Sequence, residues 1–222
     1  IVSVNCAAIP RELIESELFG YEKGAFSGAS AGGKKGLVEQ AADGTLFLDE
    51  VGDLSPEAQA KFLRFLEEGE FFRVGGTRVH KVSARVVSAT NKDLGGLIGL
   101  GRFREDLYYR LAVVKVGIPS LNERREDILP IAHHYLVEFG RKFGKPVAGI
   151  ARDAEEALTV HRWKGNVREL KNVIERAVLM GKGKVVTLED LGITRTGTAA
   201  GTEMSAPGCL SFPPVTLSGI DL

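Results

Sequence analysis

The chain has 222 residues, 44% of them hydrophobic, which is enough for one large domain or for a domain with a smaller companion. Its 29 basic and 29 acidic residues cancel, so its charge gives no reason to expect nucleic-acid binding. There is no apolar run of membrane-spanning length and no signal-peptide pattern, and Cys6 and Cys209 lack metal-ligand spacing. These features are typical of a soluble cytoplasmic protein whose thiols are incidental rather than bridged.

Residues 1–119 are predicted to form an α/β domain with a mainly parallel sheet, because strand-like runs alternate with helix-like ones. A short strand at residues 2–4 begins at the very start of the chain. Since domains rarely begin inside a strand, we expect a segment upstream of Ile1. Three apolar runs predict buried strands, the first of them buried on both faces: residues 45–48, 85–90 and 113–118.

Helix starts and hairpins are predicted between these strands. Pro10 and the pair Ser55-Pro56 suit helix N-termini, and shorter helices are expected near Leu94 and over residues 103–111. The core-facing residues expected on the first two helices are Leu13, Ile14, Leu18, Ala60, Leu63 and Leu66. The glycine-rich segments predict a loop or hairpin insertion at residues 20–36 and a hairpin at residues 71–82 that turns at Gly75-Gly76.

After Pro119 the predicted strands stop, and residues 120–193 are predicted to form an all-helical domain. Its three amphipathic helices are expected over residues 123–140, over residues 153–162 with Asp153 as N-cap, and over residues 166–180. Trp163 is expected in its core. Residues 194–222 are predicted to be a flexible linker leading towards a further domain that the sequence lacks.

Two adjacent carboxylates, Asp49 and Glu50, follow the apolar run at residues 45–48 directly. Open α/β sheets bind their ligands at such strand ends, where one carboxylate can hold magnesium while the other polarises a water molecule. The alternative is an acid-rich turn, since Asp53 lies nearby. The four apolar residues immediately upstream favour the nucleotide-site interpretation.

Two further polar positions each have a structural and a functional interpretation. Thr90 and Asn91 end the next predicted strand, where the Asn91 amide is either a turn former or a phosphate and water contact. Arg168 begins a predicted helix and either contacts a phosphate or pairs with Glu169 or Glu175.

Arg104 and Arg110 lie six residues apart on a predicted helix. They either pair with Glu105, Asp106 or solvent, as many weak surface pairs do, or act as arginine fingers on a neighbouring subunit's nucleotide.

The loop from Gly24 to Ala29 places an aromatic residue among small ones, in the order Gly24, Ala25, Phe26, Ser27, Gly28, Ala29. Turn chemistry explains this arrangement poorly. Phe26 either folds back as an anchor of the loop or offers an exposed apolar contact to a partner.

Six segments, in order, resemble the motifs of the AAA+ ATPase domain of bacterial sigma-54-dependent, NtrC-type transcription activators. The signature loop spans residues 17–29, with Ser27 where the family usually has Thr and Tyr21 where it often has His. The other segments are the asparagine motif at residues 5–8, the Walker B element at 44–50, sensor I at 88–91, the arginine-finger segment at 103–111 and sensor II at 163–170. The resemblance covers roughly residues 1–192.

The resemblance implies an AAA+ fold with a helical lid, in an ATPase that uses ATP and Mg²⁺. Asp49 would hold magnesium, Glu50 would activate the attacking water, and Asn5 matches the residue that restrains that glutamate. Asn91, beside Thr90, would sense the γ-phosphate. Arg168 would contact nucleotide in its own subunit, and the arginine pair at 104 and 110 would act in trans within a hexameric or heptameric ring.

The loop at Phe26 would grip sigma-54, so that ATP hydrolysis remodels the closed promoter complex, and the hairpin at Gly75-Gly76 would assist it. The family suggests a response-regulator type of activator in which a separate C-terminal helix-turn-helix domain binds DNA. The tail at residues 219–222 resembles the approach to that domain.

The sequence departs from the family in two places that matter for chemistry. Residues 28–34 fit Gly-x-x-x-x-Gly-Lys spacing, but Lys35 follows instead of Ser or Thr and no strand precedes, so we reject them as a phosphate loop. We expect the Walker A loop and its strand upstream of Ile1, and the chain alone to bind ATP poorly and to aggregate. Lys164 stands where the family usually has Pro, which loosens the turn before Arg168.

Two alternatives remain to an ATP-driven activator. One is a ring subunit or fragment that binds sigma-54 without turning over ATP. The other is an unrelated AAA+ remodeller, against which the Phe26 loop argues. The intact pair Asp49-Glu50 favours the enzyme, because a pure scaffold has no need of it.

Overall fold

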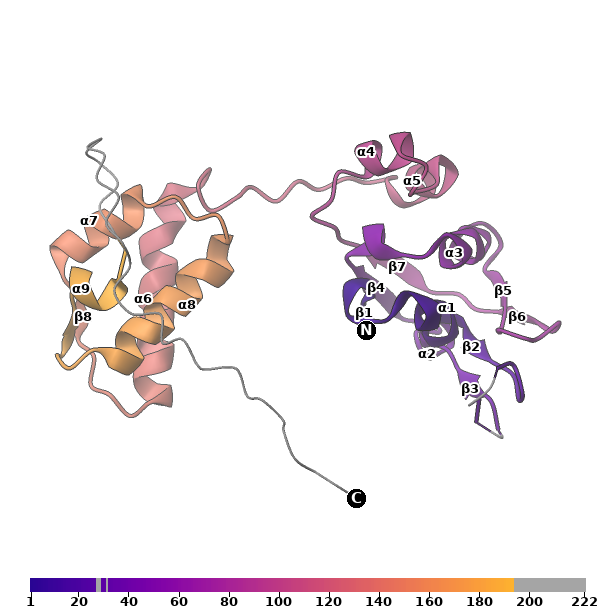
Figure 1. Cartoon of the computed structure of the whole chain (residues 1–222), viewed down its shortest axis with the longest axis horizontal. Coiled ribbons are helices and arrows are strands. Elements are labelled where there is room, and N and C mark those ends of the chain that lie inside the picture. The colour runs from indigo at the N-terminus through magenta and orange to yellow at the C-terminus, as the bar shows by residue number, and fades with distance from the viewer. Residues whose placement is uncertain (27–28, 31, 194–222) are drawn as a thin grey trace, which may run out of the picture. The chain divides into compact units, whose positions relative to one another are not determined.

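The chain divides into two compact units, Ile1–Val116 and Gly117–Leu222. The computed structural model describes residues 1–26, 29–30 and 32–193, whose helices and strands are labelled in Figure 1. Each unit has its own cluster of buried apolar residues. The predicted linker at residues 194–222 lies outside the described residues, and so do Ser27 and Gly28.

The first unit combines a parallel sheet with helices and two hairpins. Its strands are β1 (Val2–Asn5), β2 (Gly20–Tyr21), β3 (Lys34–Lys35), β4 (Thr45–Asp49), β5 (Glu70–Phe72), β6 (Val79–Lys81) and β7 (Arg85–Ser88). Its helices are α1 (Arg11–Phe19), α2 (Leu37–Gln40), α3 (Pro56–Glu68), α4 (Leu94–Gly99) and α5 (Glu105–Leu111), with 3₁₀ turns at Cys6–Ala8 and Val51–Asp53.

The parallel sheet has the order β1-β4-β7. Asn5 on β1 is paired in register with Asp49 on β4, and Leu48 is paired with Ser88 on β7. All three strands therefore end at one edge of the sheet. This arrangement brings residues from three distant parts of the sequence to the same edge, where an open α/β sheet binds its ligands.

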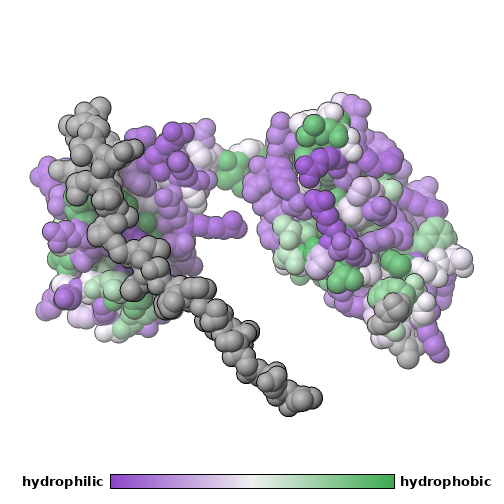
Figure 2. Space-filling view, viewed as in Figure 1, coloured by the Kyte–Doolittle hydropathy of each residue, from purple (hydrophilic) through white to green (hydrophobic). Residues whose placement is uncertain are grey.

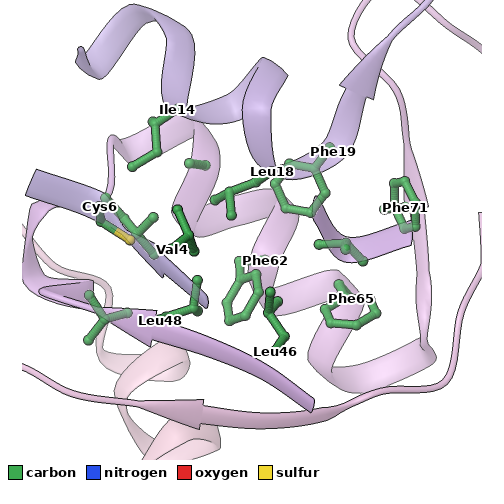
Figure 3. Packing of buried hydrophobic residues seen from close by; sticks show 14 of the residues in the cluster. Val4, Cys6, Ile14, Leu18, Phe19, Leu46, Leu48, Phe62, Phe65 and Phe71 are labelled. Atoms are coloured by element: carbon green, nitrogen blue, oxygen red, sulfur yellow. The ribbon is translucent and has the colours of Figure 1, made fainter. Parts of the chain in front are cut away.

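Helix α1 packs on the core through Ile14 and Leu18, which lie one turn apart and are both fully buried. In the same buried cluster, Phe19 contacts Phe62 of α3 and Phe71 of β5 (Figure 3). The prediction that Leu13 faces the core is wrong, because its side chain is 44% exposed. Leu13 lies beside the stripe that Ile14 and Leu18 form, not on it.

Helix α3 begins at the predicted pair Ser55-Pro56 and ends before Gly69, a residue that commonly closes helices. The Ser55 hydroxyl accepts a hydrogen bond from Ala58 N, Pro56 occupies the first helical position, and Gly69 closes the helix with φ +71°. Its buried apolar residues are Ala58, Phe62 and Phe65, whereas Leu63 and Leu66 are partly buried against the core. Ala60 is exposed, so its prediction as a core residue is wrong.

The three predicted buried strands are less buried than expected. On β4 only Leu46 and Leu48 are buried, so one face of the strand is covered fully and the other partly. Residues 113–118 form no strand at all, and Val113, Val114 and Val116 are 78–79% exposed.

The physical reason is a missing neighbour at β7. This strand pairs with β4 on one side, but no described strand lies on its other side, and Val87 is 38% exposed. A hollow of about 690 Å³ lies between β7 and the valines at 113, 114 and 116. Apolar residues, green in Figure 2, accordingly appear at the surface of the segment that joins the two units.

Two hairpins project from the first unit and contact each other. Strand β2 pairs with β3, which confirms the predicted insertion at residues 20–36, and β5 pairs with β6, which confirms the second hairpin. Val74 N donates to Gly20 O, and Glu22 N donates to Val74 O. A Cβ atom at Gly75 would lie 2.8 Å from the Cβ of Ala25, so the glycine allows the two hairpins to approach closely.

The second unit is built mainly from helices. They are α6 (Ile128–Lys142), α7 (Arg152–Val160), α8 (Asn166–Met180) and α9 (Leu188–Leu191), with a 3₁₀ turn at Arg125–Asp127. The bounds of α8 agree with the prediction, whereas α7 begins after Ala151, so Asp153 is not the N-cap.

The unit is not all-helical, because β8 (Gly149–Ile150) and β9 (Val185–Val186) form a short parallel pair that helix spacing could not predict. Its core holds Trp163, Leu170 and Ile174, all fully buried.

Candidate functional site

The acid pair lies at the carboxyl edge of the parallel sheet, as predicted. Asp49 is the last residue of β4, its Oδ1 accepts from Glu50 N at 3.1 Å, and its Oδ2 accepts from Asn5 Nδ2 at 3.3 Å. Asn5 thus contacts Asp49, not Glu50, in this structure. Glu50 has φ 54° and ψ 48°, a left-handed conformation that costs a non-glycine residue roughly 1–2 kcal/mol. This backbone ends β4 and begins the 3₁₀ turn at Val51–Asp53.

Residues after β7 complete this edge of the sheet. Asn91 N donates to Glu50 Oε2 at 3.3 Å, and Thr90 Oγ1 accepts from Lys92 N at 3.1 Å. Lys92 forms an ion pair with Asp53. The sequence placed Asn91 at a strand end beside the acids, and the parallel pairing brings them together. The sequence did not indicate the ion pair between Lys92 and Asp53. Asp53 is the acid that suggested an acid-rich turn as the alternative to a nucleotide site.

Cys6 lies just behind this edge and is buried. Burial, together with the negative charges of Asp53 and Asp49, raises the pKa of its thiol to about 12. The thiol therefore stays protonated at neutral pH, which agrees with the view that it is incidental to chemistry.

Arg104 is not part of a helix but precedes α5 as its N-cap. Its guanidinium makes a bidentate pair with Asp106, with Nε–Oδ1 at 3.0 Å and Nη2–Oδ2 at 2.6 Å. Hydrogen bonding by Arg104 lowers the pKa of Asp106. Arg110 lies in the last turn of α5, is exposed, and has no ion pair within the described part of the chain.

Gln59 positions the backbone before α5, a role that the sequence reasoning missed. Its side chain is only 1% exposed, and it donates to Leu54 O and Arg102 O while it accepts from Arg104 N at 2.9 Å. A polar residue three positions before Phe62, on the apolar face of α3, was the available signal. A buried amide with every partner satisfied fixes the segment that carries Arg104.

Arg168, in the second unit, pairs with neither acid that the sequence suggested. Glu169 accepts instead from Gly165 N at 2.8 Å and contacts His161, and Glu175 pairs with Lys142. The exposed guanidinium of Arg168 has no hydrogen bond or ion pair among the described residues. It is therefore free to meet an anion from outside the unit.

The glycine-rich loop is described at four of its six positions, since Ser27 and Gly28 are not described. Phe26 meets Tyr21 edge-on, with 5.1 Å between the ring centroids, yet it remains 40% exposed. The anchoring contact and the exposed surface thus coexist, and the structure favours neither interpretation alone.

An ion-pair cluster between the two hairpins and α2 was also missed. Arg73 binds Glu39 in bidentate fashion, at 2.8 and 2.9 Å, and reaches Glu22 at 3.2 Å. Glu39 and Arg73 are 34 residues apart in sequence, so no local pattern could reveal their contact. The cluster ties the segment before the glycine-rich loop to the second hairpin.

Comparison with known protein families gives two matches. The family described as "Sigma-54 interaction domain" matches residues 1–117, and the family described as "AAA+ ATPase lid domain" matches residues 122–206.

Curated relatives include a Nif-specific regulatory protein of Azotobacter vinelandii, 51% identical over 193 residues, and the regulatory protein AtoC of Escherichia coli, 50% identical over 190 residues. These alignments cover 87% and 86% of this chain but only 37% and 41% of the relatives, so the chain spans well under half of their length.

Solved structures of NtrX from Brucella abortus are also similar. The complex with ADP has a TM-score of 0.80 and the complex with ATP 0.79, both at 41% sequence identity. Each match covers 91% of this chain and 45% of the NtrX chain. Among the described residues, no helix has the length and apolar character needed to cross a membrane.

Proposed function

Because the chain belongs to the sigma-54 interaction domain family of transcription activators, we propose that the intact protein hydrolyses ATP to remodel sigma-54 RNA polymerase at a closed promoter. One observation carries the proposal: Asp49 and Glu50 meet Asn5 and Asn91 at the carboxyl edge of the parallel sheet. The NtrX structures in complex with ATP and ADP support nucleotide as the ligand. We assign the protein to the bacterial cytoplasm.

The donor set at this edge suits a magnesium-bound nucleotide. Mg²⁺ usually binds through one or two carboxylates together with phosphate oxygens and water, and the Asp49 carboxylate keeps lone pairs free beyond the two N–H groups that it accepts. The ion supplies positive charge against the phosphate oxygens.

The neighbouring side chains orient the attacking water and the phosphate. Glu50 accepts a proton from water, Asn91 N and Asn5 fix the two carboxylates, and the Asn91 amide lies ready to donate to a phosphate oxygen. Thr90 holds the turn that carries Asn91.

Arginines complete the site. Arg168 contacts phosphate within the subunit, while Arg104 and Arg110 act on the nucleotide of the next subunit in a hexameric or heptameric ring. Arg104 and Asp106 are each 48% exposed, so their pair contributes little and opens readily when a phosphate competes for the guanidinium.

An activator of this kind also needs a phosphate-binding loop and a DNA-binding domain. The lysine of the Gly-x-x-x-x-Gly-Lys spacing does not serve such a loop, because Lys34 lies on β3 and pairs with Glu17. A strand entering between β7 and residues 113–116 would cover the exposed valines.

Catalysis is tested with Glu50→Gln in the intact protein. We expect kcat for ATP hydrolysis to fall by about 10²–10⁴, with ATP affinity retained, because the amide cannot accept a proton. Asp53→Asn is the matched control, since Asp53 pairs with Lys92 and is expected to leave kcat within about threefold. Equal rates for Glu50→Gln and the wild type would remove Glu50 from catalysis. No turnover in either would favour a sigma-54-binding subunit without ATPase activity.

The partner contact is tested by capture of sigma-54 in the presence of a transition-state nucleotide analogue. We expect Phe26→Ala to abolish capture, because the partly exposed ring supplies the apolar contact. Leu100→Ala, at a 70% exposed apolar side chain that follows α4, is the control and should capture normally. Normal capture by Phe26→Ala would show that the ring only anchors the loop.

A further inference from the structure

The turn at residues 163–166, which precedes Arg168, is hydrogen-bonded to residues 121–122 through asparagine side chains. Within the turn itself, Asn166 N donates to Trp163 O at a long 3.4 Å and Lys164 N donates to Arg162 O at 3.1 Å. Lys164 carries no ring to fix its φ, as proline would. The backbone bonds within the turn are therefore weak restraints, and its one short internal bond runs from Gly165 N to Glu169 Oε2 at 2.8 Å.

Two asparagines supply the side-chain hydrogen bonds that join this turn to residues 121–122. Asn122 Nδ2 donates to Trp163 O at 2.8 Å, and Asn122 Oδ1 accepts from Trp163 N at 2.9 Å, so one side chain satisfies both backbone groups of one residue. In return, Asn166 Oδ1 accepts from Leu121 N at 2.8 Å. The two segments thus exchange three bonds in a reciprocal pattern, which we call the asparagine clamp.

The clamp joins two buried anchors. Leu121 and Trp163 are both fully buried in the core of the second unit, and the Trp163 indole donates to Leu158 O at 3.0 Å. Asn166 has φ 51°, a conformation that asparagine tolerates better than most residues. The clamp therefore fixes a defined backbone turn against a rigid core.

Arg168 follows Asn166 by two residues in the first turn of α8. Arg168 lines a groove together with Gly165, Glu169 and Arg176, and it forms no ion pair with an acid in the described part of the unit. The direction of this side chain consequently depends on how the helix start is held.

We propose that Asn122 and Asn166 are positioning residues that aim Arg168 at the nucleotide phosphates, replacing the stiffness that proline would give at position 164. This inference rests on the proposed ATP binding. Neither asparagine touches the nucleotide; both act through the backbone of residues 163–166.

The first measurement needs no nucleotide. Hydrogen exchange of the Trp163 amide is compared in the intact protein, Asn122→Leu and Ser120→Ala. Because Asn122 Oδ1 accepts the Trp163 N–H, Asn122→Leu should speed its exchange at least about tenfold. Ser120 bonds only to Glu123 in the same loop, so its variant should exchange like the wild type. Unchanged exchange in Asn122→Leu would refute the clamp.

The second measurement is equilibrium ATP affinity of the same proteins, with Arg168→Ala and the double variant. Loss of a charged phosphate contact should weaken ATP binding about tenfold in Arg168→Ala. Asn122→Leu should weaken it similarly, and the double variant should be no weaker than Arg168→Ala, because both changes remove one interaction. Additive losses, or wild-type affinity in Asn122→Leu, would overturn the positioning role.

Asn166→Gly is a second test of the clamp, and it keeps the proposal testable if Asn122→Leu does not fold. Glycine accepts the positive φ, so this variant removes only the bond to Leu121 N, and ATP affinity should fall about threefold. Wild-type affinity in this variant would count against the proposal. Absence of ATP binding by the wild type would instead refute the proposed function, and the exchange result would still decide whether the clamp exists.

Discussion

The two units differ in how completely they cover their apolar residues. The second unit buries Trp163, Leu170 and Ile174 fully, and each lies among neighbours from the same unit. In the described part of the first unit, β7 has a partner strand on one side only, and Val113, Val114 and Val116 are at least 78% exposed. An apolar run becomes a strand only where a partner strand lies within reach, whereas an amphipathic helix needs only a surface to cover.

The largest expected effect is in the well-covered unit. Trp163→Ala should lower the free energy of unfolding of the second unit by about 3–5 kcal/mol, because it leaves a large cavity and removes the indole hydrogen bond to Leu158 O. Urea denaturation followed by helical circular dichroism measures this change. Val160→Ala, at a 53% exposed residue of the same unit, should shift it by less than about 0.5 kcal/mol. Similar losses in both variants would mean that the core is less well packed than the structure shows.

The second effect concerns the ion pair between Arg73, which follows β5, and Glu39 of α2. Arg73→Met should lower the free energy of unfolding of the first unit by about 2–3 kcal/mol at pH 7, because the bidentate pair with Glu39 is only 14–16% exposed.

The same variant has a predicted pH signature. Burial alone would raise the pKa of Glu39, but the hydrogen bond and charge of Arg73 lower it below its ordinary 4.5. A lowered carboxyl pKa stabilises the fold above pH 4.5, and this stabilisation is lost as the pH falls through the folded-state pKa. The difference between wild type and Arg73→Met should therefore shrink in acid. A difference that stays constant from pH 7 to pH 3 would contradict this explanation.

Helix caps allow a matched comparison between the units. Ser55→Ala should cost about 1–2 kcal/mol, because the Ser55 side chain caps Ala58 N in a buried setting. Thr187→Ala should cost less, about 0.5–1 kcal/mol, because its capping box with Asp190 is exposed to water. Thermal unfolding of both variants checks the order, and a larger loss for Thr187→Ala would reverse it.

The smallest expected change in stability is at the open edge. Val114→Asp should alter the free energy of unfolding by less than about 0.5 kcal/mol, because the side chain is 79% exposed. The new charge should nevertheless reduce self-association of the 222-residue chain, measured by light scattering at increasing concentration. Unchanged self-association would show that another surface causes it.

Features that depend on nearby residues could be predicted from the sequence. The bounds of α8 follow from its apolar spacing, and the acid pair meets Asn91 because parallel strands end at a common edge. The predicted strand at residues 113–118 does not form. An apolar pattern indicates that a segment needs a neighbouring strand, but it does not show whether such a strand lies beside it.

Contacts between distant polar residues were beyond the sequence reasoning. Gln59 accepts a hydrogen bond from Arg104 N across 45 positions, and Asn122 holds Trp163 across 41. Single polar residues at such separations carry no periodic signal, and the hydrogen bonds form only after the helices have packed. The sequence thus indicated which arginines are candidates for the site and left unseen the side chains that hold the backbone beside them.

The left-handed backbone at Glu50 has a consequence for protein engineering. Glycine adopts φ 54° without the steric cost that glutamate bears there, so Glu50→Gly relieves strain in the folded chain. A laboratory selection for heat resistance alone would therefore enrich a variant that lacks the predicted water-activating carboxylate. Screens for a more stable form of this protein need an ATPase assay as well as a melting curve. The melting curve would rank Glu50→Gly above the wild type, and the ATPase assay would rank it below.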